Sequence, residues 1–105
     1  MAEVEERITR IQYHEGVFAL LIVDENGKVL RTTIMQENGK YDKIDSKLIA
    51  TSITALAKKA RSVVRDLNPL NDLTFFRVRA RKQEIMVAPD KHLFLIVIQN
   101  CDNEL

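Results

Sequence analysis

The chain has 105 residues, of which 46% are hydrophobic and 30% charged, and its formal net charge is +1. A chain of this length is expected to fold as one domain, residues 1–105, around a single hydrophobic core. A charge so close to zero argues against nucleic acid as a partner, and the longest apolar run, residues 17–23, is too short to cross a membrane. The single cysteine, Cys101, excludes an internal disulfide and indicates a reducing compartment such as the cytosol.

The first third of the chain predicts a helix followed by a β-hairpin. Residues 4–11 carry apolar side chains at helical spacing, and Gly16 is the usual residue just past the end of a helix. The run 17–23 is apolar at every position, which predicts a strand covered on both faces. An Asn-Gly pair at residues 26–27 is the strongest short hairpin signal, so residues 28–33 are expected to return as a more polar edge strand.

A long helix is predicted for residues 46–67, after a loop at residues 34–45. Asp45 is a plausible N-cap, and Asn68-Pro69 ends the helix. The apolar stripe of this helix is expected to cover one face of the sheet, and it consists of Ile49, Ile53, Leu56, Ala60, Val63 and Leu67. Several alanines keep the helix slim. They either let a second helix approach or are present only because alanine has a high helix propensity.

Three strands are predicted for the last third of the chain, at residues 73–80, 84–88 and 94–98. The run 94–98 is again apolar at every position, and a turn with Pro89 precedes it. The first of these strands ends in the densest basic patch of the chain, which includes Arg77, Arg79, Arg81 and Lys82. Such charges either protect an edge strand from unwanted pairing or meet an acidic partner.

The order α-β-β-α-β-β-β predicts an α/β domain, more strictly an α+β sandwich: a five-stranded antiparallel sheet with a helix on each face. Strands that are apolar on both faces need cover on both sides. The two such strands are expected side by side at the centre of the sheet. The predicted order across the sheet is 28–33, 17–23, 94–98, 84–88 and 73–80.

No catalytic or cofactor site is expected. His14, His92 and Cys101 have no partner at metal-ligand spacing and no local signature of a nucleophile. Gly27 and Gly39 lie in Asn-Gly turns without the spacing of a phosphate-binding loop. The sequence therefore predicts a protein that is not an enzyme and that carries neither metal nor cofactor.

Nearly the whole chain resembles one family. The segments that carry the resemblance are 1–6 (MAEVEE), 60–66 (ARSVVRD), 71–75 (NDLTF), 84–91 (EIMVAPDK) and 94–100 (FLIVIQN). They closely resemble the signature of the roadblock family of dynein light chains, most strongly after residue 60. An ungapped octapeptide such as EIMVAPDK is much more specific than a gapped motif. The chain departs from the pattern at residues 34–45, which look longer and more charged than in the typical cytoplasmic member.

The resemblance implies the fold derived above and a two-fold dimer through the edge strand 73–80 and the long helix 46–67. It implies a non-catalytic light chain of a dynein motor complex, whose dimer holds a segment of the dynein intermediate chain. The dimer is expected between identical chains or with a related roadblock light chain, in the cytoplasm and cytoskeleton or in a cilium or flagellum. Distant bacterial relatives regulate small GTPases, which is the alternative function.

The expected dimer also has a physical reason. An unpaired edge strand of about eight residues without Pro, apolar on both faces, would invite aggregation unless a two-fold mate continued the sheet. The residues predicted at this interface are Ile53, Leu56, Ala60, Leu73, Phe75, Phe76 and Val78. With so little net charge, the dimer is expected to hold a partner segment by apolar anchors, with little dependence on salt.

Overall fold

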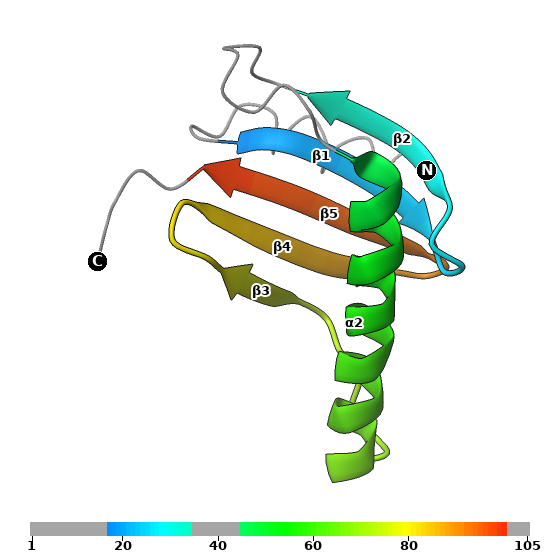
Figure 1. Cartoon of the computed structure of the whole chain (residues 1–105). Coiled ribbons are helices and arrows are strands. Elements are labelled where there is room, and N and C mark those ends of the chain that lie inside the picture. Colours follow the sequence, from blue (N-terminus) through cyan, green and yellow to red (C-terminus); the bar gives the residue numbers. More distant parts are fainter. Residues whose placement is uncertain (1–16, 35–44, 101–105) are drawn as a thin grey trace.

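The computed structural model describes residues 17–34 and 45–100 as a five-stranded sheet crossed by one long helix (Figure 1). The elements are β1 (Val17–Asp24), β2 (Val29–Ile34), α2 (Ser46–Leu67), β3 (Phe76–Arg79), β4 (Gln83–Asp90) and β5 (Leu93–Asn100). The helix predicted near residues 4–16 and most of the loop predicted at residues 34–45 lie outside the described residues. One helix-covered face of the sheet is therefore shown.

The order of the strands across the sheet is β2-β1-β5-β4-β3, and every neighbouring pair is antiparallel. This is the order predicted from the sequence. The two strands that are apolar throughout, β1 and β5, lie at the centre, where Leu21 faces Ile96 and Leu20 faces Val97. The more polar β2 and the short β3 form the two edges.

Both faces of the central strands are buried. On the face that meets α2, Leu21, Val23 and Ile96 are completely shielded from solvent and belong to one hydrophobic cluster. On the opposite face, Leu20 and Val97 are 1% and 4% exposed and belong to a second cluster. Continuous apolar strands are typical of a sheet whose two faces both lie inside the molecule.

Helix α2 begins and ends as its sequence predicts. The Oδ1 atom of Asp45 accepts a hydrogen bond from the backbone N–H of Leu48 at 3.0 Å, which satisfies one of the free donors of the first turn. At the other end, the N–H of Asn68 donates to the carbonyl of Val64, and Pro69 follows. The predicted span of residues 46–67 is confirmed.

The side of α2 that meets the sheet differs from the prediction. Its buried residues are small apart from one isoleucine: Ala50, Ile53, Thr54 and Ala57. The predicted stripe lies about a quarter turn away, because successive residues advance by about 100° around a helix. Of that stripe, Ile53 is buried, whereas Leu56, Val63 and Leu67 are 42%, 46% and 83% exposed. The small residues allow the close approach. The interpretation of the stripe as the sheet-facing side is right for Ile49 and Ile53, which pack in or against the core cluster, and wrong for Leu56, Val63 and Leu67.

Helix α2 also extends past the sheet. Its N-terminal half packs against β1 and β2, and its C-terminal half continues beyond β3 with no strand behind it (Figure 1). No residue after Ala57 in this helix is buried. The second half of the helix therefore presents nearly its whole circumference to its surroundings.

Strand β3 is shorter than predicted, because residues 73–75 do not join it. Phe76 pairs with Val87, and continuing that register would place Thr74 opposite Pro89. Proline has no N–H to donate to a neighbouring strand, so the ladder ends before it. The turn between β4 and β5 also differs from the prediction: β4 runs through Pro89 to Asp90, and Lys91, at φ 55°, begins the turn.

Candidate interaction surface

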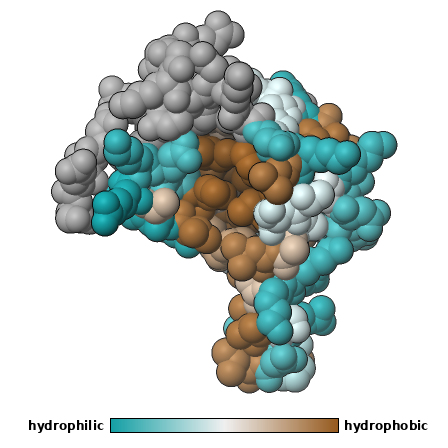
Figure 2. Space-filling model, viewed as in Figure 1, coloured by the Kyte–Doolittle hydropathy of each residue, from teal (hydrophilic) through white to brown (hydrophobic). Residues whose placement is uncertain are grey.

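The described part of the chain carries a group of exposed and half-buried apolar side chains on one flank of α2 and on the nearby edge of the sheet. We call it the apolar surface, and it consists of Leu56, Ala60, Val63 and Leu67 of α2, Phe76 and Val78 of β3, and Ile85 of β4. Figure 2 shows apolar atoms gathered over the sheet beside α2 and again at the C-terminal end of the helix. Large exposed apolar areas of this kind mark interaction sites in folded proteins.

Alternation along β3 determines which of its side chains join this surface. Phe76 and Ile85 pack against the cluster beneath α2, and Val78 lies directly opposite Ile85 in the ladder. Side chains of directly paired residues lie on the same face of a sheet. Phe76 and Val78 therefore face the α2 side, at the outer edge of the sheet.

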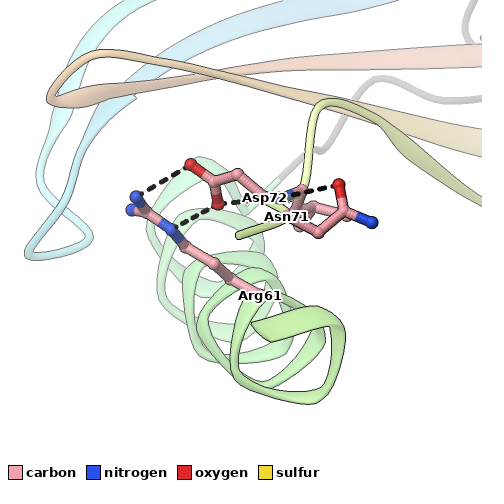
Figure 3. Close-up of polar contacts among 4 residues, drawn as sticks. Arg61, Asn71 and Asp72 are labelled. Carbon is pink, nitrogen blue, oxygen red and sulfur yellow. Dashed lines mark hydrogen bonds and ion pairs between the residues drawn. The ribbon is translucent and has the colours of Figure 1, made fainter. Parts of the chain in front are cut away.

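The segment between α2 and β3 is held against the helix by one charged contact (Figure 3). Nε of Arg61 lies 2.8 Å from Oδ1 of Asp72, and a second guanidinium nitrogen lies 3.1 Å from Oδ2. The backbone N–H of Leu73 donates to the same Oδ1 atom, and the N–H of Asp72 donates to Asn71. The hydrogen bond from Leu73, followed by that from Arg61, lowers the pKa of Asp72 below its usual value of 3.8. This contact fixes the entry of the chain into β3.

The first four of the seven predicted interface residues lie on α2 or just before β3. Leu56 is exposed and Ala60 half-buried on the flank of α2 that faces away from the core of the chain. Ile53 is 8% exposed and belongs to the core of the chain itself, which leaves it little surface to offer a partner. Leu73 precedes β3 and is half-buried.

The remaining predicted residues divide between the two faces of the sheet. Phe76 and Val78 lie on the α2 side. The ring of Phe75 lies under the guanidinium carbon of Arg77, 5.7 Å from its centroid. Arg77 pairs with Met86, which packs on the face away from α2, so Phe75 belongs to that side of the edge.

Three residues of the apolar surface were missing from the predicted interface: Val63, Leu67 and Ile85. Val63 and Leu67 belong to the predicted stripe of α2, so the signal for them was present and was assigned to the wrong neighbour. The only signal for Ile85 is that it alternates with Glu84 and Met86, which places it on one face of a strand. That signal does not show that the neighbouring strand β3 is short.

Within the described ranges 17–34 and 45–100, no group of three or more His, Cys, Asp and Glu side chains is arranged to hold a metal ion. Nδ1 of His92 lies 3.5 Å from a carboxylate oxygen of Glu25, and both side chains are exposed in adjoining turns. No helix in the same ranges is long and apolar enough to span a membrane.

Comparison with known proteins gives the family. The model of the Roadblock/LC7 domain matches residues 3–100. The chain belongs to the Roadblock/LC7 family. The resemblance deduced from the sequence segments is thereby confirmed at the level of the family.

Solved structures share the roadblock fold at low sequence identity. A structure described as MglB with tetrameric arrangement is 15% identical, with a TM-score of 0.75, and the match covers 93% of this chain and 71% of that one. The Roadblock/LC7 domain from Streptomyces avermitilis is 12% identical, with a TM-score of 0.74, over 90% and 75% of the two chains. Gliding protein MglB from Thermus thermophilus is 17% identical, with a TM-score of 0.73, over 94% and 70%. Identities this low show the fold.

Two of the five segments that carry the roadblock signature form neighbouring strands. Segment 84–91 forms nearly all of β4 and the start of its turn, and segment 94–100 forms most of β5. Val87 and Ile96, within these segments, are completely buried. Part of this signature therefore specifies the core of a roadblock domain, and the rest lies at the surface of the sheet.

Proposed function

We propose that this roadblock domain is a non-catalytic scaffold. It pairs with a second roadblock chain through the apolar surface, and the resulting dimer holds a partner protein. The observation that carries the proposal is the position of the apolar surface on the exposed flank of α2, beside the open edge strand β3. A structural relative described as MglB with tetrameric arrangement supports assembly from several roadblock chains.

The geometry suits a two-fold, isologous dimer. Two β3 strands would run antiparallel at the seam and continue the two sheets as one, while the overhanging halves of the two α2 helices cover each other. Val78 on the strand and Leu56 on the helix would then lose solvent exposure together. An interface of this type uses the same patch on both chains, so it accepts an identical chain or a close relative.

A small GTPase is one candidate partner, with this chain as its regulator or scaffold. Distant bacterial members of the family have this role, and the similar solved structures favour it because three of them are MglB proteins. These structures support the proposal through the shared fold alone, since the proteins are 15–18% identical to the chain.

The dynein intermediate chain is the other candidate. A different observation favours it: the ungapped segments 84–91 and 94–100 closely resemble those of roadblock-type dynein light chains. On this proposal the protein supports microtubule-based movement as a light chain, in the cytoplasm and cytoskeleton or in a ciliary or flagellar arm. This support comes from the resemblance of the amino-acid sequence, and the solved structures do not add to it.

Affinity capture of partners from cell extract tests the scaffold and separates the two candidates. Dynein heavy and intermediate chains in the captured material would identify a motor subunit, and a small GTPase would identify a regulator. Leu56→Glu should abolish capture because it places a charge in the apolar surface. Leu48→Glu is the matched control, since Leu48 is an exposed leucine of the same helix at 60% exposure and lies outside that surface. Capture of neither class by the wild-type chain would contradict the proposal.

A further inference from the structure

The face of β3 turned away from α2 carries two arginines around a buried carboxylate. Arg79 is directly opposite Glu84 in the ladder, and Arg77 is two residues before Arg79 on the same face. Glu84 is only 6% exposed, whereas the side chains of Arg77 and Arg79 are 58% and 43% exposed. We call these three residues the arginine cluster.

The buried carboxylate orients both arginines without occupying them. Oε2 of Glu84 lies 3.7 Å from a guanidinium nitrogen of Arg77 and 4.0 Å from one of Arg79. Both distances exceed the usual limit of about 3.2 Å for an N–H···O hydrogen bond. The only hydrogen bond of either guanidinium within the described part of the chain is from Arg77 to the sulfur of Met86, at 3.8 Å. Most of their donors are therefore available to an anion from outside.

Apolar groups limit how these guanidinium groups can move. Arg77 lies over the ring of Phe75 and beside the sulfur of Met86. A guanidinium group stacked on a ring keeps its edge donors free and in fixed directions, which favours binding to both oxygens of a carboxylate. Charges that serve only to protect an edge strand need neither a stacked ring nor a shared buried carboxylate.

We propose that the arginine cluster binds an acidic segment of the partner protein. The inference rests on the proposed scaffold function and deepens it, because it states the chemistry of part of the segment that the dimer holds. It departs from the expectation of apolar anchors with little dependence on salt, because the arginine pair adds an electrostatic contribution. Alternate residues on one face of a strand are about 7 Å apart. An extended segment with acidic side chains at alternate positions would therefore place one carboxylate at Arg77 and the next at Arg79.

Nucleic acid fits this cluster less well than an acidic polypeptide. The carboxylate of Glu84 is within 4.0 Å of both arginines and would repel a continuous row of phosphates. The net charge of the whole chain is +1, so no wider field would hold a polyanion. Two well-placed carboxylates need only the two guanidinium groups.

Fluorescence anisotropy with short labelled probes tests the inference on the intact chain. The probes are an octapeptide of alternating Glu and Thr, the same peptide with Gln for Glu, and a single-stranded oligonucleotide of equal length. Measurements at about 10 mM and about 150 mM salt, where the Debye length is about 30 Å and about 8 Å, report the electrostatic share of binding. The Glu peptide should bind, more weakly at the higher salt, and the Gln peptide should not.

Three variants assign the binding to the cluster, and a lysine pair serves as the control. Arg77→Gln/Arg79→Gln should weaken the Glu peptide about tenfold at low salt, since two exposed charge pairs are lost. Lys58→Gln/Lys59→Gln removes the same charge from exposed positions of α2 and should leave affinity unchanged. Glu84→Gln should tighten binding about threefold, because the competing carboxylate is gone. Arg77→Lys/Arg79→Lys keeps the charge and should recover part of the affinity.

Each outcome decides the inference. It is overturned by a Glu peptide that does not bind, by equal losses in the arginine and lysine pairs, or by an oligonucleotide that binds as tightly as the peptide. Circular dichroism confirms that each variant is folded, and the arginine-to-lysine variant remains informative if the glutamine variant is not. Sedimentation of the same samples reports the dimer separately. A dimer that ignores acidic peptides refutes only this inference, and a monomer refutes only the proposed pairing.

Discussion

At the scale of single residues, the contact between Arg61 and Asp72 ties the segment that leads into β3 to helix α2. The side chains of Arg61 and Asp72 are 47% and 51% exposed, so the contact is screened by solvent and its contribution to stability is small. Its importance is geometric: two nitrogens of one guanidinium meet the two oxygens of one carboxylate across the α2–β3 connection. The apolar surface spans both sides of this connection, and the pairing of β3 with β4 sets the place of β3 in the sheet.

The lowered pKa of Asp72 predicts a pH dependence with a definite sign. A carboxyl whose pKa is depressed by folding stabilises the protein above its unfolded pKa, and this stabilisation is lost as the pH falls through the folded pKa. Asp72→Asn should therefore lower the urea midpoint slightly at neutral pH and not at pH well below 3.8. Asp66→Asn removes the same charge near the end of α2 and should cause no loss at either pH. A deficit of Asp72→Asn that persists in acid would contradict the assignment.

At the scale of elements, α2 approaches the sheet through small side chains and leaves its larger apolar ones outside. Ala50 and Ala57 have no solvent exposure, while Leu56 is 42% exposed. A slim helix–sheet contact stabilises the domain less than a row of leucines would. With small residues against the sheet, one helix can contact both the sheet and a second chain, because its leucines stay exposed.

This close approach predicts that α2 does not tolerate enlargement on its sheet side. Ala57→Leu should lower the free energy of unfolding by about 1–3 kcal/mol, because the extra methyl groups have no space between the helix and the sheet. Ala55→Leu is the control: Ala55 is exposed on the same helix, and its change should stay within about 0.5 kcal/mol. Urea denaturation at one protein concentration measures both. Equal losses in the two variants would show that helix propensity, not packing, is responsible.

The hydrogen-bond register of β3 shows which of its N–H groups face a mate. Ala80 donates to the carbonyl of Gln83 at 2.8 Å, and hydrogen-bonded pairs alternate along an antiparallel ladder. Val78 and Phe76 therefore direct their N–H groups inward to β4. Those of Arg77 and Arg79 point outward at the edge, where a second β3 would pair.

A proline at Arg77 should therefore prevent pairing at the edge while leaving the fold intact, because an edge strand tolerates proline where the N–H faces outward. Sedimentation should find a dimer for the wild type and a monomer for Arg77→Pro, with unchanged circular dichroism. Arg77→Gln is the control and should remain dimeric, since it keeps the N–H. Val78→Pro would break the ladder to β4 and should unfold the edge as well. A wild type that stays monomeric at tens of micromolar would refute the dimer.

Particular residues show how much of the arrangement of strands and helix the sequence predicts. The strand order follows from two apolar runs, because strands with no polar face belong at the centre of a sheet. The orientation of α2 does not follow, because both its small residues and its leucines recur at helical spacing. The end of β3 depends on Pro89 lying opposite Thr74, and only the register between two strands shows that. The residues of the apolar surface were predicted only in part, because they depend on the orientation of α2 and on the length of β3.

At the scale of the whole molecule, the described residues form a sheet with one well-covered centre and two unlike edges. Strand β2 ends the sheet on one side, near the N-terminal half of the helix, and β3 ends it on the other, where the C-terminal half of the helix continues past the sheet. The features that suggest recognition lie at the β3 end: the apolar surface on one face and the arginine cluster on the other. Such an arrangement suits a scaffold that binds rather than transforms its partner.

The isolated chain should therefore show no intrinsic ATP or GTP hydrolysis. The proposed scaffold role needs no chemical step. A phosphate-release assay on the purified protein checks this, with Leu56→Glu as a second sample prepared in the same way. Turnover that a point substitution in this chain abolishes would contradict the non-catalytic role. Turnover equal in all preparations indicates a contaminant.

If the chain pairs as proposed, the overhang of α2 links the stability of this protein to its concentration. Leu67 at the end of α2 and Leu70 in the turn that follows are 83% and 97% exposed, and a paired chain would cover them. If pairing is coupled to folding, the melting temperature should rise with protein concentration. In a cell, copies made in excess of their mates would keep those leucines exposed to chaperones and proteases. The amount of the subunit would then follow the supply of its mate, so assembly itself would set its abundance.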